Sequence, residues 1–248
     1  MCVSVNALFG CILAFVTSLA GAETLQVAVA SSFAPAMRVL AERFEADTGN
    51  LVRLSYGSTG KQYAQIRNGA PFDLFFAADA RRPELLENKG LVVQGSRFTY
   101  AFGQLVLWSP QPDLVDAGGE VLRGNRYRHL AVANPKLAPY GAAAQQVLSS
   151  LGLWDETRSR LVFGENVGQT LQLVVSGSAE LGFVARAQVM SLGAKHRGSW
   201  WQPPQSTYTP LQQQVVLLSE QPAARAFWKF VQSDQARKMI QQAGYDIP

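Results

Sequence analysis

Short apolar runs alternate with helix-like patterns from residue 25 onward, and this alternation restricts the chain to an α/β fold. In the helix-like segments apolar residues recur at helical spacing, as Phe33, Met37 and Leu40 do before Gly49. The opening predicts strand, helix, strand, helix and strand at residues 25–30, 33–48, 51–56, 61–68 and 73–79. Because such units pack as a parallel sheet with helices on both faces, we expect a sheet of that kind.

The alternation resumes in the second half of the chain, after a short helix at 83–88 and one long strand-like run. Residues 98–109 form this run, and the single Gly103 inside it indicates a bend or a bulge. The pattern that follows predicts strands at 129–133, 161–163 and 181–185, helices at 142–151 and 168–176, a loop over 199–204, a strand at 211–218 and helices over 223–243.

We predict that these elements form two α/β lobes. The first lobe comprises residues 23–103 and 208–248, and the second comprises residues 104–207. The chain then crosses between the lobes twice, near 102–105 and near 208–211. Two extended connections make a hinge, and they place a ligand cleft between the lobes.

Residues 1–22 differ from the rest of the chain because they include no Asp, Glu, Lys or Arg. An apolar run over 8–16 precedes Ala20-Gly21-Ala22, which is the order of a secretory signal peptide. The run is shorter than the roughly 20 residues that a membrane-spanning helix needs. We predict a signal peptide over 1–22, cleaved after Ala22, and an exported protein. Lipidation at Cys11 is the alternative. Both cysteines leave with the predicted signal peptide, so the mature chain uses no disulfide.

The charge of the chain gives little indication of a partner. The formal net charge of +4, from 22 Lys and Arg against 18 Asp and Glu, is too small to indicate nucleic acid. Arg81-Arg82 and Arg126-Tyr127-Arg128 are short basic groups that we interpret as solvated surface or as a docking surface. We therefore predict no nucleic-acid partner.

Small and polar residues occupy the points where predicted strands lead into helices. Ser31-Ser32 follows the first strand, with Ser32 as the expected N-cap, and Gly57-Ser58-Thr59-Gly60 follows the second. Pro139-Tyr140-Gly141 and Asn166-Val167-Gly168 precede helices of the second lobe. Each start offers unpaired amides at the positive end of a helix, and the first two add hydroxyls. Any one of them alone is commonly only a cap. Two from each lobe predict an anion-binding cleft whose donors are uncharged.

Several stretches of the chain also resemble a known family. They are residues 68–71, 75–79, 96–101, 105–109, 134–135, 138–141 and 181–185. In order and spacing the chain resembles the periplasmic molybdate-binding proteins of ABC importers, in the substrate-binding protein family. The resemblance implies a two-lobed periplasmic binding protein fold, with a hinge and an interlobe cleft that closes over molybdate or tungstate. It further implies a monomer that needs no cofactor, ligates no metal directly and delivers its oxyanion to a membrane permease.

The resemblance also implies which residues bind the ligand. Hydroxyl groups of the first lobe and backbone amides of the second provide the ligands that it implies, at Ser31, Ser32, Ser58 and Thr59 in the first lobe and at Tyr140 and Val167 in the second. Some members of the family place a tyrosine where Ala185 stands, and this chain lacks that hydroxyl.

Two other functions stay open at this stage. The same architecture serves receptors for other tetrahedral oxyanions, such as sulfate, thiosulfate or phosphate. An enzyme acting on an anionic substrate is the less favoured alternative, because His129 and His196 have no neighbouring carboxylate or nucleophile motif. Asp73 and Asp79 flank a strand, and we interpret them as turn caps. The sequence contains no metal-ligand cluster, P-loop or nucleophile elbow. We predict that the protein is not an enzyme.

Overall fold

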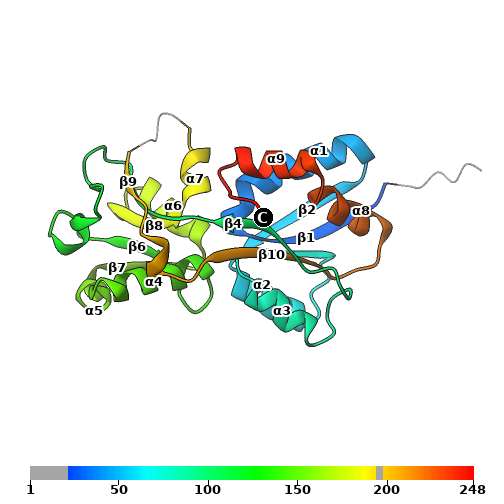
Figure 1. The fold of residues 1–248 in the computed structure, drawn as a ribbon, viewed down its shortest axis with the longest axis horizontal. Helices are drawn as coiled ribbons and strands as arrows, with labels where there is room; N and C mark the ends of the chain where they lie inside the picture. Colours follow the sequence, from blue (N-terminus) through cyan, green and yellow to red (C-terminus); the bar gives the residue numbers. More distant parts are fainter. Residues whose placement is uncertain (1–21, 194–197) are drawn as a thin grey trace, which may run out of the picture.

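Two lobes lie side by side along the longest axis of the molecule, each built on a five-stranded sheet (Figure 1). The computed structural model describes residues 22–193 and 198–248. The strands of the first sheet, in spatial order, are β2 (Leu51–Gly57), β1 (Thr24–Ala30), β3 (Leu74–Ala77), β10 (Leu211–Leu217) and β4 (Phe98–Gly103). Those of the second are β7 (Leu161–Gly164), β6 (Leu130–Ala133), β8 (Leu181–Ala185), β5 (Leu105–Ser109) and β9 (Ser199–Trp201).

Helices cover both faces of the first sheet, as the sequence predicts (Figure 1). One face carries α1 (Ala34–Thr48), α8 (Pro222–Val231) and α9 (Asp234–Gln242), and the other carries α2 (Thr59–Arg67) and α3 (Arg81–Glu87). Val27 and Val29 of β1 pack towards the first set, whereas Ala28 packs towards the second. Successive side chains of a strand point to opposite faces, so a strand buried on both sides is apolar throughout.

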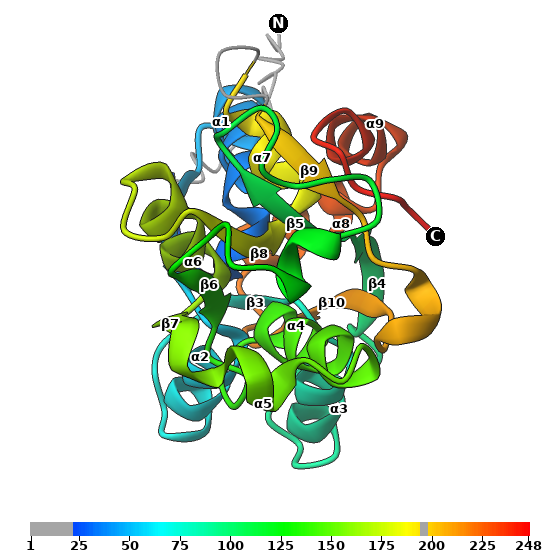
Figure 2. The ribbon, with the colours of Figure 1, turned by 90° about the vertical axis from the view of Figure 1, so that its left-hand side faces the viewer.

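The second lobe has a core of its own, in which α4 (Pro139–Ser150) and α6 (Val167–Val175) pack against the second sheet. Two shorter helices, α5 (Trp154–Thr157) and α7 (Arg186–Ser191), complete this lobe, which faces the viewer in Figure 2. The sequence pattern predicted neither short helix, and it assigned β9 to a loop. Each of these elements has six residues or fewer, which is too short for a clear periodic pattern.

Both sheets are mixed, which corrects the expectation of a purely parallel sheet. Strands β1, β2 and β3 run parallel, as do β6, β7 and β8, but β10 runs antiparallel to both of its neighbours and so does β5. β5 and β10 are the strands that enter a lobe from the other one. Both strands start at the edge of the sheet where its parallel strands end, and they therefore run antiparallel to those strands.

The long strand-like run over residues 98–109 divides at the bend predicted for Gly103. β4 belongs to the first sheet and β5 to the second, with only Gln104 between them. The chain returns to the first lobe in the segment between β9 and β10, and the predicted crossing near 208–211 lies in this segment. The two-lobed fold is therefore confirmed. Where each lobe begins and ends stays a prediction, with residues 23–103 and 208–248 in the first lobe and residues 104–207 in the second.

No helix within residues 22–193 and 198–248 is both long enough and apolar enough to span a bilayer. The predicted signal peptide lies outside the described residues, except for Ala22.

Candidate functional site

A small cavity between the two lobes is lined by all six residues that the sequence analysis selected. We call it the interlobe cavity, and it is lined by Ala30, Ser31, Ser32, Gly57, Ser58, Thr59, Ala78, Ala138, Pro139, Tyr140, Asn166 and Val167. None of these side chains is charged. The cavity is small, with a volume of about 10 Å³ for the centre of a water-sized sphere, which is about what one water molecule needs. It therefore suits a small ion rather than a large organic molecule.

The carboxyl ends of the parallel strands explain why these residues meet. Ser31, Ser58 and Ala78 directly follow β1, β2 and β3, while α4 and α6 follow β6 and β7. Ligands bind at this edge of open α/β sheets, because the loops there are free of the strands and helix N-termini point at the crevice. In this fold the two edges face one another.

At the start of α2 only one of the first-turn amides remains available. Ser58 caps the helix, and its hydroxyl accepts from the Lys61 amide at 3.4 Å. The Gly60 amide donates across the lobes to the Leu137 carbonyl at 2.8 Å. The Thr59 amide, at the first helical position, has no acceptor within the helix.

The start of α6 repeats this arrangement from the other lobe. Asn166 caps the helix by accepting from the Gln169 amide at 3.0 Å. The Gly168 amide donates across the lobes to the Ser31 hydroxyl at 3.1 Å. The Val167 amide, at the first helical position, likewise has no acceptor within the helix.

The start of α4 lies three residues earlier than predicted, so Tyr140 belongs to the first helical turn. Pro139 occupies the first position, where its missing N–H costs nothing and its φ angle already suits the helix. The amides of Tyr140 and Gly141 have no acceptor within the helix. The glycine at 141 is required because a Cβ there would collide with the Ala133 carbonyl of β6. Gly141 therefore serves the packing of α4 against β6.

The prediction that Ser32 is an N-cap is wrong. Residues Ser31–Phe33 form a 3-10 turn, and α1 begins at Ala34 without a capping side chain. A cap at Ser32 would accept from the amide at the second or third helical position, but the Ala34 amide already donates to the Ser31 carbonyl and Pro35 has no N–H. Ser32 is 1% exposed, and its hydroxyl has no hydrogen-bond partner among the described residues. A buried hydroxyl without a partner costs about 1–3 kcal/mol, so its place in the cavity wall indicates a ligand.

The remaining hydroxyls of the cavity are already engaged as acceptors. Thr59 Oγ1 accepts from the Ala78 amide at 3.0 Å, as Ser58 Oγ and Ser31 Oγ accept from Lys61 and Gly168. A hydroxyl carries one proton and two acceptor sites. Each of the three therefore keeps its proton for an acceptor in the cavity.

Two phenol groups and a glutamine lie behind the cavity. Sequence reasoning selected Tyr140 for its backbone amide alone and did not select Tyr100 or Gln213. The Tyr140 hydroxyl accepts from Gln213 Nε2 at 3.2 Å, and the Tyr100 hydroxyl donates to Gln213 Oε1 at 2.9 Å. Burial, followed by the neighbouring Tyr208, raises the pKa of Tyr140 above its usual value of 10.0, so this phenol is neutral at physiological pH. Gln213 sits in a run of three glutamines that gives no local signal of a role.

Other residues discussed from the sequence lie away from the interlobe cavity. Ala185 is buried at the end of β8, outside the cavity lining. Asp79 accepts from the Arg82 amide three residues later and so caps a turn, as predicted. Asp73 instead accepts from the Gln26 amide of β1, 47 positions away, so the interpretation of Asp73 as a turn cap is wrong. His129 is exposed, and His196 lies outside the described residues. Among the described residues, no group of three or more His, Cys, Asp or Glu is placed to hold a metal ion.

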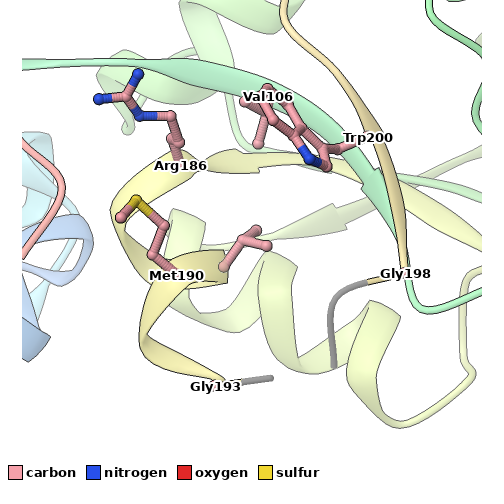
Figure 3. A pocket seen from close by; sticks show the side chains of 7 residues that line it. Val106, Arg186, Met190, Gly193, Gly198 and Trp200 are labelled. Atoms are coloured by element: carbon pink, nitrogen blue, oxygen red, sulfur yellow. The ribbon is translucent and has the colours of Figure 1, made fainter. Parts of the chain in front are cut away.

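A larger cavity on the second lobe contains none of the predicted site residues (Figure 3). Its volume is about 510 Å³. Its lining is mainly apolar, at Val106, Arg186, Val189, Met190, Gly193, Gly198 and Trp200. The one charged side chain, Arg186, donates to the Gly244 carbonyl at 3.2 Å and lies 3.7 Å from an Asp246 oxygen. Of these two cavities, the interlobe cavity is therefore the one whose lining suits an anion.

Comparison with known proteins agrees with this geometry. The family model of bacterial extracellular solute-binding proteins matches residues 25–246. The molybdate-binding protein ModA of Azotobacter vinelandii is 49% identical over 231 residues, which cover 92% of each chain. ModA of Rhodobacter capsulatus is 41% identical over 229 residues, covering 91% of this chain and 89% of that protein.

Solved structures show the same relationship. The periplasmic molybdate-binding protein of Azotobacter vinelandii superposes with a TM-score of 0.87 at 46% identity, covering 90% of this chain and 99% of that one. The sulfate-binding protein SubI of Mycobacterium tuberculosis, at 17% identity and a TM-score of 0.70 over 90% of this chain and 86% of that one, shares the fold. This chain belongs to the family of bacterial extracellular solute-binding proteins.

Proposed function

We propose that this protein captures molybdate in the periplasm and delivers it to the membrane permease of an ABC importer. The observation that carries the proposal is the uncharged, donor-rich interlobe cavity, with the partnerless Ser32 hydroxyl in its wall. The relatives from Azotobacter vinelandii and Rhodobacter capsulatus, both named as molybdate-binding proteins, support the choice of ligand.

The proposed ligand set comes from both lobes. Hydroxyl protons of the first lobe and free first-turn amides of the second would bind the oxygens of the anion, at Ser31, Ser32, Ser58, Thr59, Tyr140 and Val167. Molybdate at neutral pH has four oxygens that only accept hydrogen bonds. A cavity lined by hydroxyls and free amides, without a carboxylate, offers several donors and no charged acceptor, and a dianion that loses its hydration needs a donor for nearly every oxygen.

The same donor set bears on selectivity. Hydrogen phosphate carries a proton that needs a strong acceptor, and no carboxylate lines this cavity to accept it, so phosphate is disfavoured. Tungstate has the shape and charge of molybdate, and we expect it to bind as well. Sulfate has the same charge with shorter bonds, and discrimination against it depends on the size of the cavity. A receptor for sulfate is therefore the alternative function.

The protein acts as a receptor rather than as an enzyme in this proposal. No charged side chain lines the interlobe cavity to serve as a general acid or base. The chain would be exported by its signal peptide over residues 1–22, cleaved after Ala22. It would act as a monomer without a cofactor, since its metal arrives inside the oxyanion.

Isothermal titration calorimetry with molybdate, tungstate, sulfate and phosphate tests the proposal. We expect tight binding of molybdate and tungstate with one ion per chain, and much weaker or no binding of sulfate and phosphate. Tight sulfate binding in place of molybdate would establish the alternative receptor. The absence of tight binding to either metal oxyanion would refute the proposed function.

A further inference from the structure

Tyr140 contacts both the cavity and the sheet of the first lobe. Its main chain lines the interlobe cavity, in the first turn of α4. Its phenol is 1% exposed and accepts from Gln213 Nε2 at 3.2 Å. Gln213 is fully buried on β10, the strand by which the chain returns to the first lobe. One hydrogen bond therefore connects the cavity-lining helix of the second lobe with the sheet of the first.

The other crossing strand approaches the same point. Gly103 ends β4, and a Cβ at this glycine would collide with the Tyr140 hydroxyl and lie 2.5 Å from Gln213 Nε2. The missing side chain lets the phenol and the amide meet directly against the backbone of the first crossing. Both connections between the lobes thus enclose the Tyr140 hydroxyl.

A bulge in the first sheet directs a second phenol at Gln213. In the pairing of β10 with β4, Gln213 lies opposite Ala101 and Gln214 lies opposite Thr99, which leaves Tyr100 between them. A bulge of this kind changes the direction of a side chain. The Tyr100 hydroxyl is 2.9 Å from Gln213 Oε1, so the buried amide has a partner at each end.

The hydrogen bonds continue from Tyr100 to the first-lobe side of the cavity. The Tyr100 hydroxyl also lies 3.1 Å from the Ala77 carbonyl. The same peptide group presents the Ala78 amide, which donates to Thr59 Oγ1 at 3.0 Å. The single Tyr100 proton is shared between Gln213 Oε1 and the Ala77 carbonyl. These polar contacts join Thr59 to Tyr140, and Gln213 is their central member.

We propose that Gln213 is a positioning residue of the oxyanion site. By holding Tyr140 against the two crossing strands, it fixes the first turn of α4 relative to Thr59 when the lobes are together. The inference rests on the proposed function, because the affected ligand is the oxyanion in the interlobe cavity. Gln213 itself does not line that cavity and acts only through Tyr140.

The binding test compares Gln213→Met with Gln214→Met. Methionine keeps the length of the side chain and removes its hydrogen bonds. Gln214 is also buried, but it bonds Arg97 and Thr99 of its own lobe, which makes it a matched control. We expect Q213M to weaken molybdate binding about threefold to tenfold, the worth of one hydrogen bond of about 0.5–1.5 kcal/mol, and Q214M to bind like the parent.

A second variant separates positioning from general stability. Tyr140→Phe keeps the backbone amide and removes only the hydroxyl, so it should weaken binding as Q213M does. The double variant should bind no more weakly than Q213M alone, because both changes break one interaction. A residue with only a structural role would lower the melting temperature and leave the Kd unchanged. Parent-like affinity in both single variants overturns the inference.

A measurement without ligand decides the inference independently of the proposed function. The Ala142 amide donates to the Ala138 carbonyl at 3.0 Å, so its hydrogen exchange in the molybdate-free protein reports the stability of the first turn of α4. We expect exchange there to be at least about threefold faster in Q213M and Y140F than in the parent and in Q214M. Unchanged exchange overturns the positioning role. Failure of the parent to bind molybdate would instead overturn the proposed function. The exchange result would then decide the positioning role of Gln213.

Discussion

The Gly60 amide donates to the Leu137 carbonyl at 2.8 Å, and this bond joins the start of α2 to the opposite lobe. The Gly168 amide at the start of α6 does the same in the reverse direction, donating to the Ser31 hydroxyl at 3.1 Å. In each helix the amide at the second position joins the lobes, and the amide at the first position remains for the cavity. The contacts that close the lobes and the proposed contacts to the ligand thus come from adjacent peptide groups.

Replacing Gly60 should therefore hinder closure. A Cβ at residue 60 would lie 2.8 Å from the Leu137 carbonyl oxygen and 3.1 Å from an Arg82 nitrogen. We expect Gly60→Ala to weaken molybdate binding at least about tenfold, because the lobes must separate to relieve the contact. Gly124→Ala is the control, since its Cβ would meet only an atom at 3.6 Å. Calorimetry on both variants checks this, and equal affinities would contradict it.

Replacing Ser32 should affect stability and binding in opposite directions. Its hydroxyl is buried without a partner in the ligand-free protein, so Ser32→Ala removes an unsatisfied group. We expect the melting temperature of the ligand-free variant to equal or exceed that of the parent, while molybdate affinity falls at least about tenfold. Adding Thr59→Ala should weaken binding much further. Differential scanning calorimetry with and without molybdate measures both effects, and a parent-like Kd in the double variant would show that the site lies elsewhere.

The Lys61–Glu165 ion pair should contribute little to closure. Its atoms are 2.9 Å apart, but the two side chains are 54% and 43% exposed. Exposed pairs are worth about 0–1 kcal/mol and are screened by salt. We expect Glu165→Gln to change the molybdate Kd by less than about fivefold at low salt, and not at all at about 1 M salt. A large effect that persists at high salt would indicate a role in the site itself.

The buried phenols should make the fold sensitive to alkali. Burial raises the pKa of Tyr100, Tyr140 and Tyr245 above 10.0, whereas the unfolded chain titrates near that value. Above a pH of about 10 the unfolded state loses protons that the folded state keeps, so stability is complete below this pH and falls above it. Urea unfolding between pH 8 and 11 measures the slope. Y140F should reduce the slope, and an identical slope would contradict the assignment.

The starts of the helices show how far local pattern carries. The caps at Ser58 and Asn166 follow from residue type alone, because a side-chain oxygen two or three residues before an amide is a local relation. The start of α4 was misplaced although Pro139 marks it, since proline favours the first helical position. The predicted cap at Ser32 is wrong because Pro35 has no N–H and the Ala34 amide donates to the Ser31 carbonyl instead.

Neighbours within a few residues account for the alternation of strands and helices and for the uncharged donors at four strand ends, because periodicity and capping are local relations. The packing of the two lobes settles which amides join the lobes and which remain for the cavity. It also brings Gln213 to Tyr140, 73 positions away in the chain. Such pairs depend on how two sheets are placed against each other. No spacing along the chain encodes that placement.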